Sequence, residues 1–393
     1  MNTRKNFGYG ARSSMCAIAV VLALALSALS LTGCPNEDNK SDPKVTWPTG
    51  LTAVYGQPLS SVPLAAYTNE GGTAGAFSWA KPADTFGEYG VQSHNMIFTP
   101  GNTSKYSTAK KGVDVLVSSV EIVSVAGGSF TMGSPDTETD RSSDETQWQV
   151  TLSPFYLGKY EVTQKEYEDV MGSLPDSLKD SSTYGKGNTY PIYYVSWYDA
   201  LVFCNKLSVK EGLTPAYSID GKTDPAEWGT VPTSSDATWN AAEVVAGSTG
   251  YRLPTEAQWE YAARGGSSAS GYKIYSGSDT VGEVAWTSEN NGSSGEPNYG
   301  TKQVGTKAPN ELGIYDMSGN VWEWCWDWYG TYPTEAKTDP VGASSGSFRV
   351  LRGGSWINAA VYARSAYRTT ATRTAGATLW ASVSCAPSLM AQV

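Results

Sequence analysis

Few side chains in this 393-residue sequence could carry out chemistry. The sequence has one histidine, His94, and five cysteines, with Cys204, Cys325 and Cys385 scattered through its second half. Zinc, non-haem iron and Ser-His-Asp sites each need a neutral imidazole as ligand or base. Most of that chemistry is therefore excluded, and we expect His94 to be packed or solvated. Three cysteines so far apart form no disulfide framework, so we expect buried free thiols, with a single disulfide as the alternative.

Two groups of acidic residues have a spacing that could support acid/base work. Asp327 follows Glu323 by four residues, and Asp136, Glu138 and Asp140 alternate along the chain. Neither group has a nucleophile and base beside it, so we interpret both as calcium ligands or solvated loop charges. The formal net charge of −10 also argues against nucleic acid as a partner.

The N-terminus has the features of an export signal. Arg4, Lys5 and Arg12 precede a charge-free run over residues 17–31, which is shorter than the roughly 20 residues of a spanning helix. The following Leu-Thr-Gly-Cys resembles a bacterial lipobox, which implies a signal peptide over 1–33 and a lipid on Cys34. The alternative is an uncleaved anchor. We expect a polar tether over 34–44 and a lipid-anchored protein of the cell envelope, displayed at the outer-membrane surface, with no other membrane contact.

The elements that must position any site fall into two parts. Residues 45–117 contain short apolar stretches broken every eight to twelve residues by turn formers, which predicts a small all-β sandwich of about seven strands. This part resembles bacterial immunoglobulin-like modules, which act as spacers. In the second part, over 120–393, three capping boxes predict helices that end near glycines; they are Thr163 with Glu166, Ser196 with Asp199, and Thr255 with Gln258, before Gly172, Gly212 and Gly265.

A series of motifs in the second part resembles the formylglycine-generating enzyme family, or sulfatase-modifying factors. The motifs are Gly-Gly-Ser-Phe-Thr-Met-Gly at 127–133, Tyr-Glu-Val-Thr at 160–163, Tyr-Arg-Leu-Pro-Thr-Glu-Ala-Gln-Trp-Glu-Tyr-Ala at 251–262, Gly-Asn-Val-Trp-Glu-Trp at 319–324 and Arg-Gly-Gly-Ser-Trp at 352–356. The resemblance implies an α+β, C-type-lectin-like fold. The fold class we predict is therefore α+β, with the lectin-like domain preceded by the all-β module.

The resemblance also suggests what this chain lacks and what it could bind. Enzymes of the family hold copper on two cysteines, at the positions that Asn358 and Ala363 occupy here. Neither is a thiol, so we expect no copper and no catalytic residues, with a family-type oxidase as the alternative. By the same resemblance, calcium would take the backbone carbonyls of Asp316, Gly319 and Val321 and the carboxylate of Glu323, with a plain turn as the alternative.

Four tryptophans alternate along residues 322–328. Period two places all four on one face of a strand, which could be a ladder for stacking carbohydrate or a stripe that packs on the core. We favour the packed stripe, because the family uses part of this motif.

The C-terminal segment has an unusual composition. Between the fixed-looking Arg352, Arg364, Arg368 and Arg373, the intervening residues of 357–378 can all be reached from an asparagine codon by changing adenines alone. This frame resembles the variable region of diversity-generating retroelement proteins, specifically the lectin-fold lipoproteins of Treponema. The resemblance implies a ligand-binding surface, with an ordinary closing strand as the alternative; its residues are Ile357, Asn358, Ala359, Val361, Tyr362, Ala363, Tyr367, Thr369, Thr370, Thr372 and Thr374.

Together these features predict a surface lipoprotein that binds an unknown protein or glycan with a variable segment on a catalytically inactive scaffold. The alternatives are an enzyme of the sulfatase-modifying type and a structural envelope protein.

Overall fold

The computed structural model describes residues 40–65, 67–179, 184–375, 385–387 and 390–391. The predicted signal peptide and Cys34 lie outside this range, as do residues 376–378 of the predicted variable region. Among the described residues, no helix is long and apolar enough to cross a bilayer.

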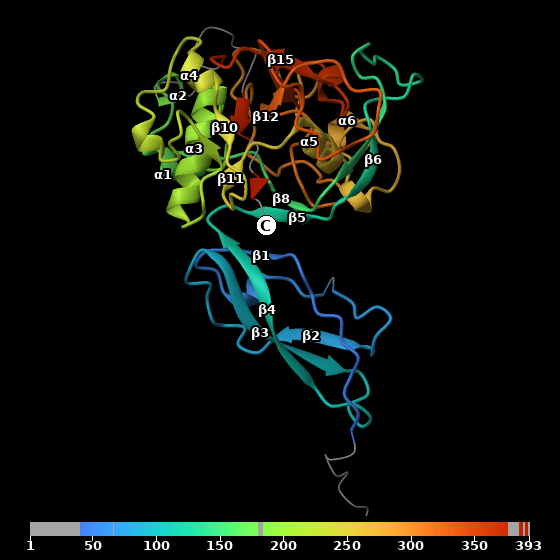
Figure 1. Ribbon diagram of the computed structural model, residues 1–393. Helices are drawn as coiled ribbons and strands as arrows, with labels where there is room; N and C mark the ends of the chain where they lie inside the picture. The colour runs from blue at the N-terminus through green and yellow to red at the C-terminus, as the bar shows by residue number, and fades with distance from the viewer. Residues whose placement is uncertain (1–39, 66, 180–183, 376–384, 388–389, 392–393) are drawn as a thin grey trace, which may run out of the picture.

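The N-terminal module is a single mixed sheet whose spatial order is β1-β4-β3-β2 (Figure 1). Its strands are β1 (Leu51–Val54), β2 (Gly75–Trp79), β3 (Gly90–Pro100) and β4 (Ala109–Ser118), with a 3-10 turn at Leu59–Ser61. Strands β2, β3 and β4 pair antiparallel, whereas β1 runs parallel to β4. Alternate residues of β3 and β4 face the core. There the rings of His94 and Phe86 meet edge to face, with their centroids 5.1 Å apart.

The prediction of about seven strands is wrong for this module: the described residues form four. In the turn-rich stretches between the strands, the backbone N–H and C=O groups form hydrogen bonds with other loop residues and do not pair as further strands. Asn69 is the clearest case, since its side-chain amide donates to the carbonyls of Lys44 and Thr73 and its Oδ1 accepts from the Thr46 N–H at 2.7 Å.

The module joins the second domain through a short, well-bonded junction. Strand β4 ends at Ser118, and three residues separate it from β5 (Ile122–Val125). Buried Glu211 accepts the N–H and Oγ–H of Ser119 on one oxygen and the hydroxyl of Tyr251, at 2.7 Å, on the other. The junction therefore has a buried polar anchor.

The second domain combines α-helices with small sheets, which confirms the predicted α+β class. The helices are α1 (Gln164–Met171), α2 (Asp176–Lys179), α3 (Trp197–Lys210), α4 (Ala237–Asn240), α5 (Glu256–Ala263) and α6 (Val281–Val284), with 3-10 turns at Pro225–Glu227, Gly266–Ser268 and Ala360–Ala363. All three predicted capping boxes are present, at the N-termini of α1, α3 and α5. Gly172 is the C-cap of α1, and Gly212 and Gly265 follow the C-cap residues of α3 and α5; all three have positive φ.

The sheets of this domain bring distant parts of the chain together. One has the order β15-β14-β12-β16, and its strands are β12 (Trp322–Trp328), β14 (Arg349–Arg352), β15 (Thr369–Ala371) and β16 (Cys385–Pro387). A second has the order β11-β17-β8-β5, with β8 (Phe155–Gly158), β11 (Tyr251–Arg252) and β17 (Met390–Ala391). The others are β13-β7-β6, with β6 (Gly128–Met132), β7 (Trp148–Leu152) and β13 (Lys337–Thr338), and β10-β9, with β9 (Tyr217–Ser218) and β10 (Glu243–Val244).

Helix α5 is the centre of this arrangement. It packs against β6, β12 and β14, and all eight of its residues are buried, including Glu256 and Glu260. Strand β15 lies at the end of the domain opposite the N-terminal module (Figure 1). The predicted binding segment is thus remote from the end at which the chain enters.

Candidate functional site

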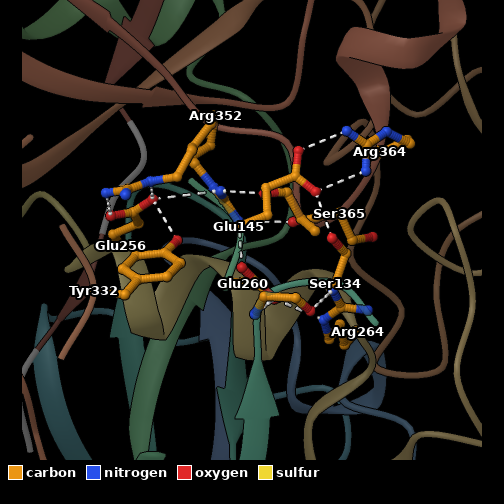
Figure 2. A network of polar contacts seen from close by, with 12 residues as sticks. Ser134, Glu145, Glu256, Glu260, Arg264, Tyr332, Arg352, Arg364 and Ser365 are labelled. Carbon is orange, nitrogen blue, oxygen red and sulfur yellow. Dashed lines mark hydrogen bonds and ion pairs between the residues drawn. The ribbon is translucent and has the colours of Figure 1, made fainter. Parts of the chain in front are cut away.

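Arg352, Arg364 and Arg368, three of the four arginines that frame the C-terminal segment, are held by buried ion pairs (Figure 2). Arg352 donates to Glu260 at 2.6 Å, and Arg368 donates to both oxygens of Glu256 at 2.8 and 2.7 Å. Arg364 reaches both oxygens of Glu145 at 2.8 and 2.6 Å. Charge-assisted and bidentate pairs of this kind are the strong class of hydrogen bond.

The same arginines also hold the backbone of the segment. Arg352 donates to the carbonyls of Ser365 at 2.7 Å and Ala366 at 3.0 Å. Gly354, at φ +75°, lies so close to the backbone of the segment that a Cβ at this position would be 2.8 Å from the carbonyl oxygen of Tyr362. This glycine permits the close approach that its neighbours need. The Arg352 side chain and the close packing at Gly354 thus fix the path of the segment on its buried side.

The electrostatics of α5 follow from these contacts. Burial raises the pKa of Glu260, but the positive charges of Arg264 and Arg352 outweigh it, so the pKa lies below its usual value. The carboxylate therefore remains ionised and paired. Glu256 likewise accepts from Arg352, Arg368 and the hydroxyl of Tyr332.

Most of the residues predicted to bind ligand lie at the surface above this network. We call them the C-terminal face: Ile357, Ala359, Val361, Tyr362, Tyr367, Thr369, Thr370, Thr372 and Thr374, each exposed or half-buried. Tyr362 and Tyr367 meet edge to face with ring centroids 5.0 Å apart. Tyr367 also lies 6.1 Å from the ring of Trp322, which donates its indole N–H to Asn358.

Two predicted ligand-binding residues have a different environment. Ala363 is only 1% exposed and packs with Val284 and Ala285 of the α6 region, so its assignment to the surface was wrong. Its small side chain fills a tight space between the 3-10 turn and α6. Asn358 is half-buried, and its Oδ1 accepts from Ser355 at 2.5 Å as well as from Trp322 at 2.9 Å. We therefore assign Asn358 to the support of the face.

The four alternating tryptophans form no exposed ladder. Trp322 and Trp324 are buried in the core, and Trp326 packs between Trp197 and Tyr217. Both faces of β12 are covered, because the intervening Cys325 is buried as well. The packed-stripe interpretation is confirmed. Cys204 and Cys325 are buried free thiols, as predicted.

Of the predicted acidic residues, Asp327 and Glu138 are integrated into the fold, whereas Asp136 and Asp140 are exposed loop residues. Asp327 accepts the N–H of Glu256 at the start of α5, and burial together with the charge of Glu256 raises its pKa to about 7. Glu138 pairs with Arg364 and accepts the Tyr272 hydroxyl, and Asp136 pairs with Arg141 at 2.7 Å.

The predicted calcium segment is a tight turn ahead of β12. Asp316 is buried at φ +57°, burial raises its pKa to about 6, and its carboxylate accepts the Gly305 N–H. Glu323 accepts the indole N–H of Trp259 at 3.0 Å. Within the described ranges, no three His, Cys, Asp or Glu side chains form a metal-binding group. Any ion here would thus depend on backbone carbonyls, as the prediction requires.

Sequence analysis missed one residue at this turn. Glu161 is buried and accepts the Val321 N–H at 2.9 Å and the Asn320 amide at 2.7 Å. Burial, and then the negative charges of Asp316 and Glu323, raise its pKa well above the usual value. The signal was available, because Glu161 belongs to the Tyr-Glu-Val-Thr motif.

The family follows from comparison with known proteins. The model of the sulfatase-modifying factor enzyme 1-like domain matches residues 111–378. This chain belongs to that family. The sulfatase-modifying factor fold of residues 111–378 thus accounts for the arrangement of α5, β12 and the C-terminal segment.

Proteins with several different names are similar to this chain. A chaperone protein, LppX, of Paenibacillus barcinonensis is 41% identical over 63% of this chain and 82% of its own length. The formylglycine-generating enzyme of Thermomonospora curvata is 29% identical over 60% of this chain and 82% of its own length. The structure of Treponema denticola variable protein 1 superposes with a TM-score of 0.59 at 30% identity, covering 77% of this chain and 99% of that one. The predicted resemblance to the formylglycine-generating enzymes and to the variable proteins of Treponema is confirmed.

Proposed function

We propose that this protein displays a ligand-binding surface, the C-terminal face, on a sulfatase-modifying factor scaffold that has no oxidase activity. One observation carries the proposal. Arg352, Arg364 and Arg368 are fixed by buried glutamates, whereas the side chains of the C-terminal face are exposed or half-buried. Such side chains can change without disturbing the core. The similarity to Treponema denticola variable protein 1 supports the same function.

The chemistry of the face suits a protein or glycan partner. Its tyrosines offer contact area at small cost in conformational entropy, and its threonines offer adaptable hydrogen bonds. It contains no charged residue, so binding would not require an unpaired charge to lose its water. The proposal is tested by probing protein and glycan arrays with the full chain. A specific partner supports it, and a chain that captures nothing on either array contradicts it.

The absence of oxidase activity is a separate prediction. The positions that hold copper thiolates in the enzymes of the family correspond to Asn358, which bonds Trp322 and Ser355, and to the buried Ala363. Neither side chain is a soft metal ligand. With copper, oxygen and a Cys-X-Pro-X-Arg peptide, we expect the mass of the peptide to stay unchanged. Conversion of its cysteine to formylglycine, seen as a fall in mass, would instead favour the enzyme alternative.

We further propose that the mature protein is anchored by a lipid on Cys34 at the outer-membrane surface. The remoteness of β15 from the N-terminal module supports this, because an anchor at the N-terminus leaves the C-terminal face pointing outward (Figure 1). Cys34→Ala should move the protein from the membrane fraction to the soluble fraction. A variant that stays with the membrane would indicate an uncleaved anchor.

Calcium is proposed as a structural ion at the turn before β12. Asp316, Gly319 and Val321 would supply backbone carbonyls, and Glu323 would supply its carboxylate. The fit rests on the burial of Asp316 and Glu161, neither of which forms an ion pair with lysine or arginine among the described residues. A divalent cation would offset this concentration of negative charge.

Chelation should therefore lower the melting temperature of the full chain, because an ion that binds only the folded state stabilises it. An ion bound at the Asp316 carbonyl favours the ionised form of that residue's carboxyl group, whose pKa burial raises to about 6, so protonation of Asp316 opposes binding of the ion. The effect of chelator should thus be largest above pH 6 and shrink as the pH falls through that value. Melting curves with and without chelator at pH 7.5 and pH 5.5 provide the measurement. Equal curves at pH 7.5, with no calcium by elemental analysis, would contradict the proposal.

A further inference from the structure

The 3-10 turn Ala360–Ala363 carries Val361 and Tyr362 of the C-terminal face. The first N–H groups of a helical turn have no acceptor within it, and the side chain of the residue just before the turn is their usual partner. Here that residue is Ala359, whose methyl group accepts no hydrogen bond. The residue that precedes the turn therefore provides no side-chain cap for it.

Glu289 supplies an acceptor from 71 residues away in the chain. Its Oε1 accepts the Ala360 N–H at 3.1 Å. The preceding residue, Ser288, donates its own N–H to the Asn358 carbonyl at 2.9 Å. These two bonds lie on either side of Ala359, so the loop that contains Glu289 holds the chain at the point where the turn begins.

The loop that carries Glu289 is itself fixed. Thr287 is fully buried, and its N–H donates to the side-chain oxygen of Asn290 at 2.9 Å. The side-chain amide of Asn290 donates in turn to the Ala285 carbonyl at 2.9 Å. Ala285 belongs to the same buried cluster as Ala363, the last residue of the turn. The loop therefore contacts both ends of the turn and presents Glu289 from a defined backbone.

Other groups outside the C-terminal face hold the chain beyond the turn. The Ser318 hydroxyl donates to the Ala363 carbonyl at 2.8 Å, and the Ile274 carbonyl accepts the Ser365 N–H at 2.8 Å. Like the bond from Glu289, these contacts reach backbone atoms of the segment and use no side chain of the C-terminal face. They are therefore independent of which side chains the face displays.

The chemistry of Glu289 suits a cap that acts at the surface. A carboxylate bonds an N–H more strongly than a neutral acceptor does. Glu289 is exposed, so its charge keeps contact with water and the bond carries no large cost of burial. Ser, Thr, Asn, Asp and Gly are the residues preferred just before a helical turn. A cap from Glu289 allows position 359 to hold other residues as well.

We infer that Glu289 is a positioning residue for the C-terminal face. It caps the Ala360–Ala363 turn from outside the predicted variable segment and thereby holds Val361 and Tyr362 in their binding arrangement, whichever residue occupies position 359. The inference rests on the proposed function for its purpose. The cap itself is a property of the free protein, so it can be measured without a ligand.

Hydrogen exchange of the full chain, followed by mass spectrometry, gives the measurement. Glu289→Ala should speed amide exchange in residues 357–366 about fivefold, as expected for the loss of one side-chain cap. Glu289→Gln keeps a carbonyl acceptor and should exchange at close to the wild-type rate. Adding Ala359→Ser to Glu289→Ala places a hydroxyl just before the turn, where it can accept an N–H of the turn, and should restore slow exchange.

The matched control is Asp224→Ala. Asp224 caps another 3-10 turn, Pro225–Glu227, by accepting the Ala226 N–H at 2.9 Å. Its loss should speed exchange at that turn and leave residues 357–366 unchanged. With a partner identified by array, Glu289→Ala should also weaken capture about fivefold, whereas Glu289→Gln and the variant rescued by Ala359→Ser should bind nearly as the wild type does.

Three results would overturn the inference. The first is wild-type exchange of residues 357–366 in Glu289→Ala. The second is faster exchange that neither Glu289→Gln nor Ala359→Ser corrects, or loss of the whole fold, since either would give Glu289 a role other than capping. The third is loss of capture in Glu289→Gln with normal exchange, which would make the charge a direct ligand contact. If the arrays yield no partner, the proposed function fails while the exchange data still decide whether Glu289 caps the turn.

Discussion

Replacing Glu256 with alanine should reduce the free energy of unfolding by about 3–5 kcal/mol, the range found when one partner of a buried ion pair is removed. Glu256 accepts from both nitrogens of the Arg368 fork and from Tyr332 and Arg352. Without it, Arg368 keeps a buried charge whose remaining hydrogen bond is to the Gly330 carbonyl. The segment that carries the C-terminal face should then detach from α5.

Urea denaturation of the full chain gives the measurement, with Asp169→Ala as the matched control. Asp169 pairs with Lys165 on the exposed side of α1, one turn apart, and such pairs contribute about 0.3–0.5 kcal/mol. A Glu256→Ala variant that is as stable as this control would mean that the network does not support the segment.

Replacing both Tyr362 and Tyr367 with alanine should abolish capture of the ligand by the C-terminal face. Buried interface tyrosines are frequent hot spots, each contributing about 2 kcal/mol or more, so the pair together would reduce affinity by roughly a thousandfold. The two rings contact each other, and they pack at the edge of the core without entering it. The melting temperature should therefore change little.

The matched control is Tyr55→Ala with Tyr89→Ala, a second contacting pair whose ring centroids are 4.6 Å apart in the N-terminal module. Capture assays on the partner identified by array should show wild-type binding for this control. Retained binding by the Tyr362 and Tyr367 variant would place the site elsewhere, and loss of its fold would make the segment structural.

Local signals in the sequence predicted much of the second domain. Each capping box, such as Thr255 with Gln258, involves residues three apart and therefore shows directly in the chain. The family motifs supplied the order of the elements around them. The alternating tryptophans also predicted a packed strand, because their spacing reports a face.

Contacts between distant residues could not be read in this way. Arg364 and Glu145 are 219 residues apart, so no rule of sequence spacing connects them. The sequence therefore identified the frame arginines but not the glutamates that pair with them. Burial of Ala363 depends on α6, about eighty residues earlier in the chain, and its position within the segment gives no sign of that.

The parallel pairing of β1 with β4 has a mechanical consequence. The chain enters β1 from Lys44 and Thr46, which bond Asn69, and it leaves the module at the end of β4, where Ser119 is anchored to Glu211. A ligand held at the far end and a tether at the N-terminus would pull these two points in opposite directions along the strand axis. Parallel strands loaded in this way must slide past each other, so the bonds along the register from Leu51 to Val54 share the force. The module would thus resist traction as a shear clamp, where an antiparallel hairpin pulled from its open end would unzip one bond at a time.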